Sequence, residues 1–161
     1  NFPTVGLIDG VFRQNLEETG MSYDLEVEMI RKARELDLLT CPYIFDEDSA
    51  RKMALAGADV LVAHVGLTSK GSIGAQTALT LEQAAERVQN MADAAKAVRP
   101  DVLVLCHGGP IAEPGDAQQV LSSTRGIAGF FGASSIERLA TEPAIEEQAR
   151  RFRTIRLDLR G

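Results

Sequence analysis

The two histidines of the chain, His64 and His107, each close a short apolar run that is typical of a buried strand. Residues 60–63 read VLVA before His64, and residues 102–106 read VLVLC before His107. Ligands of parallel α/β folds bind at the carboxyl ends of the strands, and consecutive strands commonly lie about 4.8 Å apart. We therefore predict that the two imidazoles share a catalytic site, as acid, base or metal ligand. The alternative is a pair of hydrogen-bonded structural histidines.

Glycine and serine residues follow two of the predicted strands and suggest an anion site. Gly108 and Gly109 come directly after His107, and Ser134 and Ser135 lead toward a short predicted helix over residues 136–139. In barrel folds a phosphate often binds on backbone N–H groups between the loops after the last two strands. We predict that these four residues bind a small anionic substrate, with ordinary turn glycines as the alternative.

The longest of the later loops, residues 67–80, begins LTSKGSIGA and contains Thr68 and one lysine, Lys70. Its glycine and serine content suits a mobile lid that closes over an anion, with Thr68 as a further substrate contact. An exposed flexible loop is the alternative.

Two carboxylates, Asp9 and Glu17, lie in a predicted loop over residues 6–22. Such groups act as general bases or as ligands of a magnesium ion. We assign Glu17 to catalysis and Asp9 to a divalent metal, Mg²⁺, held through water. Carboxylates are common on loops, so exposed side chains without a role are the alternative.

Composition excludes several classes of partner. The net charge is −6 with acids and bases interspersed, so no clustered basic patch predicts a nucleic-acid surface. No apolar run approaches the roughly 18 residues of a membrane span. Cys41 and Cys106 lack metal-ligand spacing and fit free buried thiols of a cytoplasmic protein. Without a P-loop, GxGxxG or GxSxG motif, nothing supports a serine nucleophile or a nucleotide fold.

The elements that must position these residues alternate between strands and helices. The apolar runs are almost continuous, as expected for strands buried on both faces of a parallel sheet covered by helices. The pattern predicts an α/β fold of about five βα units. Strands are predicted at residues 39–45, 59–66, 101–107 and 127–132, with a truncated strand at 2–7, and helices at 23–37, 47–56, 81–98 and 142–153.

Five units cannot close an eight-stranded barrel, which takes roughly 200 residues or more. A partial barrel, an open five-stranded sheet, or two copies that close a barrel together are the possible solutions. The chain starts at Asn1-Phe2-Pro3 with no preceding methionine or helix, which favours a partial barrel that begins inside a fold. We predict a single domain over residues 1–161 whose open strand edges require a homo-oligomer or the N-terminal part of the barrel.

Five stretches of sequence are long and specific: residues 5–10 (VGLIDG), 15–21 (NLEETGM), 62–68 (VAHVGLT), 105–112 (LCHGGPIA) and 132–139 (GASSIERL). They resemble the phosphoenolpyruvate hydrolase-like family of TIM-barrel proteins. The resemblance runs from residue 1 to about residue 152, and extends to the C-terminal barrel domain of plant tobamovirus-resistance proteins.

The resemblance implies a TIM (β/α)8-barrel fold related to phosphoenolpyruvate mutase and isocitrate lyase. This chain would then cover the end of strand 4 to helix 8. It implies an enzyme that acts on a small phosphorylated or carboxylated oxoacid by hydrolysis or lyase chemistry. A non-catalytic ligand-binding or regulatory barrel is the second hypothesis, because the resistance proteins are among the relatives.

Overall fold

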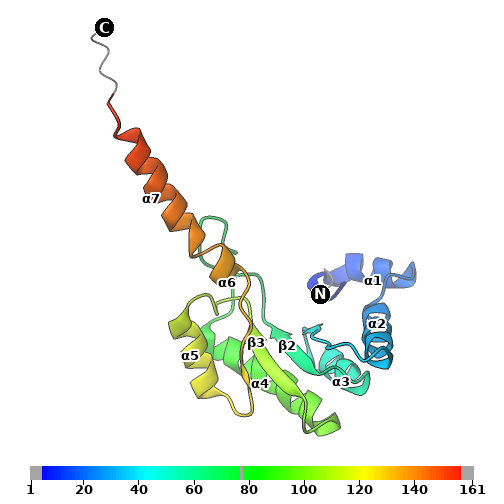
Figure 1. The fold of residues 1–161 in the computed structure, drawn as a ribbon. Helices are drawn as coiled ribbons and strands as arrows, with labels where there is room; N and C mark the ends of the chain where they lie inside the picture. Colours follow the sequence, from blue (N-terminus) through cyan, green and yellow to red (C-terminus); the bar gives the residue numbers. More distant parts are fainter. Residues whose placement is uncertain (1–4, 77, 157–161) are drawn as a thin grey trace.

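The centre of the computed structural model, which describes residues 5–76 and 78–156, is a sheet of four parallel strands (Figure 1). The strands follow one another in chain order across the sheet. Pairing extends beyond their bounds, since the Val60 and Val62 amides donate to the Thr40 and Pro42 carbonyls at 3.1 and 2.9 Å. The strands are β1 (Tyr43–Ile44), β2 (Val60–His64), β3 (Leu103–His107) and β4 (Gly129–Phe130).

Helices connect the strands, and two of these helices begin at side-chain caps. The Asp46 carboxylate accepts from the Ser49 amide at 2.7 Å, and Thr80 and Gln83 form a reciprocal capping box. Among the described helices, none is long and apolar enough to cross a membrane. The described helical segments are η1 (Val5–Leu7), α1 (Gly10–Glu18), α2 (Tyr23–Glu35), α3 (Glu47–Leu55), α4 (Leu81–Val98), α5 (Pro114–Ser123), α6 (Ser134–Glu137) and α7 (Thr141–Arg153).

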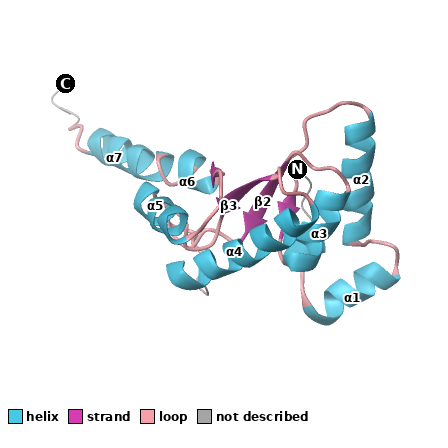
Figure 2. Cartoon of the chain, turned by 90° about the horizontal axis from the view of Figure 1, so that it is seen from below, coloured by secondary structure: helices cyan, strands magenta, loops and turns pink. Residues whose placement is uncertain are grey.

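One face of the sheet carries the hydrophobic core. Leu61, Ala63, Val104 and Cys106 alternate with their neighbours along β2 and β3 and are fully buried on the face where α3, α4 and α5 pack (Figure 2). The buried side of α4 consists mainly of alanine, and such small side chains allow helices and strands to approach closely. This packing fixes the strand ends that carry the histidines.

The opposite face of the sheet is only partly covered by the described residues. Leu103 is 51% exposed, and Val60 and Leu105 are half-buried. All three lie on the face that also carries His64 and His107. A parallel sheet with its helices on one face is compatible with the wall of a TIM-like barrel, whose helices form the outer layer.

The predicted strand at residues 2–7 is wrong where the structure describes it. Val5–Leu7 forms the 3-10 helix η1, and residues 2–4 lie outside the described residues. The Ile8 amide donates to the Val5 carbonyl at 3.0 Å, so the segment satisfies this backbone group locally rather than through a neighbouring strand. The other four predicted strands and their parallel order are confirmed, with shorter bounds.

The predicted loop at residues 6–22 is also wrong, because it contains the helix α1. No residue of α1 is buried, and its apolar side chains Val11 and Phe12 are exposed, so core packing does not stabilise this helix. Pairs one turn apart support it locally: Arg13 lies 2.9 Å from Glu17, and Gln14 donates to Glu18 at 3.0 Å.

Glu26 on α2 makes the stability of the fold depend on pH. Partial burial raises the pKa of its carboxyl from 4.5 to about 7. A raised pKa in the folded state means that stability is full below the unfolded pKa and is lost as the pH rises toward 7. We expect Glu26→Gln to raise the free energy of unfolding by about 1 kcal/mol near pH 8, after allowance for solvent screening, and to change nothing near pH 4.

Urea unfolding at these two pH values measures this difference. Glu86→Gln, on the exposed side of α4, is the matched control and is expected to change stability at neither pH. An equal gain from Glu26→Gln at both pH values would contradict the raised pKa.

Candidate functional site

His64 and His107 lie side by side at the carboxyl ends of β2 and β3. They are register partners in the parallel ladder, and their ring centroids are 4.9 Å apart. Both side chains are buried, at 8% and 7% exposure. The Val65 amide donates to the His107 carbonyl at 3.0 Å, which continues the pairing past the strand ends. The structure therefore brings the two predicted residues together, while their catalytic role stays a prediction.

Three aromatic rings complete an aromatic cluster around the histidine pair. Tyr43 stacks on His107 at 5.1 Å with an interplanar angle of 12°. Phe45 lies 5.4 Å from His64, and Phe131 lies 5.5 Å from His107. Tyr43 and Phe45 come from β1 and its carboxyl end, and Phe131 follows β4, so all four strand ends contribute. A role for these rings was not predicted from the sequence, although all three lie within predicted strands.

Hydrogen bonds to the backbone give the two imidazoles opposite tautomers. His107 Nδ1 lies 2.7 Å from the Phe131 carbonyl oxygen, which only accepts, so Nδ1 carries the proton and Nε2 keeps a lone pair. The Gly66 amide donates to His64 Nδ1 at 3.2 Å, so the neutral ring of His64 carries its proton on Nε2. The pair thus offers one acceptor nitrogen and one donor N–H.

Burial keeps both rings neutral. It lowers the pKa of His64 to about 4, with the nearby His107 as a second cause. Burial likewise lowers the pKa of His107, against the opposing effect of its bond to Phe131. Near neutral pH, His107 can therefore accept a proton, and His64 can donate a hydrogen bond without carrying charge.

The glycines after the strands hold the two strand ends together. The Gly109 amide donates to the Gly66 carbonyl at 2.6 Å, and the Ser69 amide donates to the Gly109 carbonyl at 3.1 Å. Gly108 has a φ of +81°, and a Cβ on it would overlap the Gly66 carbonyl oxygen. The Gly109 amide is thus engaged within the protein, and both glycines place the loops in close contact.

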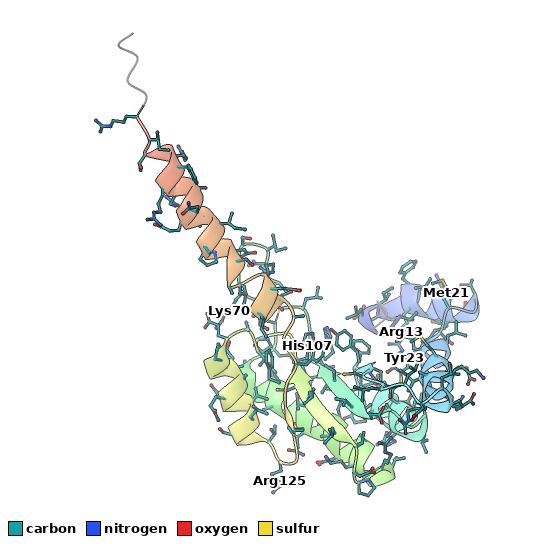
Figure 3. The ribbon with its side chains drawn as sticks, in the orientation of Figure 1. Arg13, Met21, Tyr23, Lys70, His107 and Arg125 are labelled. Carbon is teal, nitrogen blue, oxygen red and sulfur yellow. The ribbon has the colours of Figure 1, made fainter. Side chains whose placement is uncertain are left out.

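The other predicted anion and lid residues lie in the segments that follow β2 and β4. Ser134 and Ser135 form the half-buried first turn of α6. The Thr68 carbonyl accepts from the Ala75 amide at 3.0 Å. Lys70 lies 2.8 Å from Glu113 and 2.9 Å from Asp116, so its charge is paired with the start of α5. In the view of Figure 3, Lys70 and Arg13 lie on opposite sides of His107.

A pocket of about 360 Å³ opens beside His64. Asp9, Asp46 and two arginines, Arg13 and Arg87, line it. Glu17 instead lines a neighbouring pocket and pairs with Arg13. Neither arginine was predicted as a site residue, because Arg13 lies in a segment predicted as a loop and Arg87 lies on the exposed side of α4. No local signal joins them, and only the folding of the chain does.

The fit of a magnesium ion rests on Asp9. Magnesium is commonly held by one or two carboxylates, with water and substrate as its other ligands. Asp46 lines the same pocket, but its carboxylate already caps α3. The described part of the chain has no group of three or more His, Cys, Asp or Glu side chains placed to hold a metal. Asp9 stays the predicted ligand, and water and substrate would complete its shell.

One family model covers almost the whole chain. The model described as "Phosphoenolpyruvate hydrolase-like" matches residues 1–155, which include both histidines, the aromatic cluster and the pocket. The chain belongs to the phosphoenolpyruvate hydrolase-like family. The resemblance seen in the sequence is thereby confirmed, and the parallel α/β sheet fits it.

Relatives of this family member include much longer proteins. Two are from Solanum lycopersicum, "ToMV susceptible protein tm-1(GCR26)" and "ToMV resistance protein Tm-1(GCR237)", each 57% identical over 158 residues, 98% of this chain and 21% of the relative. A third, "Putative transcriptional regulatory protein y4pA" of Sinorhizobium fredii (strain NBRC 101917 / NGR234), is 32% identical over 155 residues, 96% of this chain and 25% of the relative. The chain thus spans a fifth to a quarter of these relatives.

Proposed function

We propose that this chain carries the catalytic centre of an enzyme that acts on a small phosphorylated or carboxylated oxoacid of the phosphoenolpyruvate type. The reaction is hydrolysis, or cleavage of a C–C or C–P bond next to a carbonyl. The observation that carries the proposal is the pair of buried, neutral imidazoles with opposite tautomers at the ends of β2 and β3. Membership of the family supports the substrate class.

The two histidines take different roles in such a reaction. His107 Nε2 accepts a proton from the substrate or from an attacking water, because its Nδ1 proton is committed to the Phe131 carbonyl. His64 Nε2–H donates to the substrate oxygen that gains negative charge as the bond breaks. The aromatic cluster limits the access of water, which strengthens both interactions.

The anion and metal residues complete this proposal. The anionic substrate contacts the residues predicted from the sequence, which are Gly108, Gly109, Ser134, Ser135 and Thr68. A magnesium ion held by Asp9 would neutralise part of the negative charge of the substrate. Since the Gly109 amide is engaged with Gly66, Gly109 contributes mainly by shaping the site.

The fold itself supports a proposal on assembly. The half-covered sheet face suggests the C-terminal part of a (β/α)8 barrel, in which further strands enclose Leu103 and Leu105. At the edge of β1, the Tyr43 carbonyl accepts from the Tyr23 hydroxyl at 2.7 Å, so a strand added there displaces this bond. We propose that the N-terminal part of a barrel, or a second copy, supplies these further strands.

We also propose a cytoplasmic location, because the two cysteines, Cys41 and Cys106, are free thiols, as is usual in a reducing compartment.

Turnover measurements test the proposed function. The full chain is incubated with phosphoenolpyruvate or oxaloacetate, with and without Mg²⁺, while released phosphate, pyruvate and oxalate are measured. We expect turnover of at least one acid, and shifts of both histidine imidazole NMR signals on its binding. Neither turnover nor shifted histidine signals with any acid of this class would refute the proposal.

A second candidate function is a ligand-binding or regulatory domain without turnover. The names of two relatives favour it, since one is a resistance protein and another is described as a putative transcriptional regulatory protein. Under this hypothesis the histidine signals shift on adding acid, while no product forms. The same experiment therefore separates the two functions.

A further inference from the structure

The pocket beside His64 has a charge arrangement that the roles above leave unused. Its walls come from the turn before α1, the strand end at His64 and the exposed side of α4. Two arginines, Arg13 and Arg87, enter it from α1 and α4, which are far apart in the sequence. Its volume of about 360 Å³ is in the size range of small-ligand sites.

Both guanidinium groups keep hydrogen-bonding capacity. Arg13 donates through Nε to Glu17 at 2.9 Å, and its terminal amino groups make no hydrogen bond to any described residue. Arg87 makes neither an ion pair nor a hydrogen bond within residues 5–76 and 78–156. Of the carboxylates in the pocket, Asp46 accepts from the Ser49 amide and is partly neutralised by the start of α3. The Asp9 carboxylate makes no hydrogen bond or ion pair with a described residue, so two guanidinium groups lie in the pocket with one uncommitted carboxylate, an excess that favours an anion.

We infer that Arg13 and Arg87 form an anion subsite that binds the carboxylate or phosphate end of the substrate while its reacting carbon faces the histidine pair. Guanidinium groups bind these anions through paired N–H donors, and two of them from different elements hold an anion in a fixed orientation. The identification of the bound anion as part of a substrate rests on the proposed function, whereas the binding of an anion by the two arginines does not. The subsite narrows the substrate class to small acids with an anionic group beyond the reacting carbon.

Calorimetric titration of the full chain with inorganic phosphate and with oxalate tests this subsite. We expect Arg87→Gln and Arg13→Gln each to raise the Kd of both anions about tenfold, since each removes a charge-assisted pair of hydrogen bonds. Arg87→Lys keeps the positive charge but loses the planar pair of N–H donors. Its Kd is expected to lie between that of the unchanged protein and that of Arg87→Gln. Arg51→Gln, an exposed charge on α3, is the matched control and leaves the Kd unchanged.

Arg87→Gln is the cleaner variant, because Arg87 has no pairing with a described residue to lose, whereas Arg13 supports α1 through Glu17. An unchanged Kd for both anions in both Gln variants overturns the subsite. Binding that requires Mg²⁺ and is lost in Asp9→Asn but not in the arginine variants overturns it as well.

The outcomes also separate this inference from the proposed function. If no acid is turned over but phosphate binding depends on the arginines, the subsite stands in a binding protein. If turnover occurs and neither KM nor Kd responds to the arginine variants, the enzyme stands and the subsite fails.

Discussion

His107→Asn is expected to lower kcat by a factor of about 10² to 10⁴, the usual contribution of a general base. The amide nitrogen of asparagine is as many bonds from Cα as imidazole Nδ1, so it keeps the donation to the Phe131 carbonyl. The variant lacks the Nε2 lone pair and removes only the proposed proton acceptor. Steady-state kinetics with the acid that is turned over, together with thermal unfolding, make the measurement.

Two variants of His64 test its proposed role as a hydrogen-bond donor. His64→Gln places an amide N–H near the position of Nε2–H, so it should retain much more activity than His64→Ala. Because burial lowers the pKa of His64 to about 4, its protonation should not reduce kcat/KM between about pH 8 and pH 6. Full activity of His107→Asn would contradict the assignment of the base, and equal loss in both His64 variants would contradict hydrogen-bond donation.

Gly108→Ala is expected to reduce the free energy of unfolding by roughly 3 kcal/mol. Two causes add: Gly108 has a φ of +81°, where a side chain is strained, and its Cβ would overlap the Gly66 carbonyl oxygen. The loops after β2 and β3 would separate, and turnover would fall with the loss of the histidine geometry. Urea unfolding followed by far-UV circular dichroism measures the change.

Gly115→Ala is the matched control for this substitution. Gly115 lies in the first turn of α5, has no strained φ, and a Cβ there meets nothing within 4 Å. Alanine at this position is expected to be neutral or stabilising by up to about 1 kcal/mol, because glycine is a poor helix former. Equal stability of the Gly108 and Gly115 variants would show that the loops do not depend on the close approach.

The histidine pair shows how far sequence reasoning reaches into this site. Apolar runs that end in His64 and His107 predicted parallel strands, and parallel neighbours place their carboxyl ends at one edge. The side-by-side placement of the two histidines was therefore predicted from their positions at the strand ends, and the structure pairs these two residues. The tautomers did not follow, because they depend on the carbonyl of Phe131 and the amide of Gly66, whose positions are set by loops.

Local periodicity and chain order predicted the α/β class, the parallel strand order and the meeting of the two histidines, while the five long sequence motifs predicted the family. The folded chain alone places the Gly109 amide against the Gly66 carbonyl, pairs Lys70 with α5, and joins Arg13 to Arg87 in one pocket. Each of these arrangements depends on contacts between segments that are far apart in the sequence, and local periodicity does not reveal such contacts. A surface arginine acquires a role only when the folded chain places it beside a buried site.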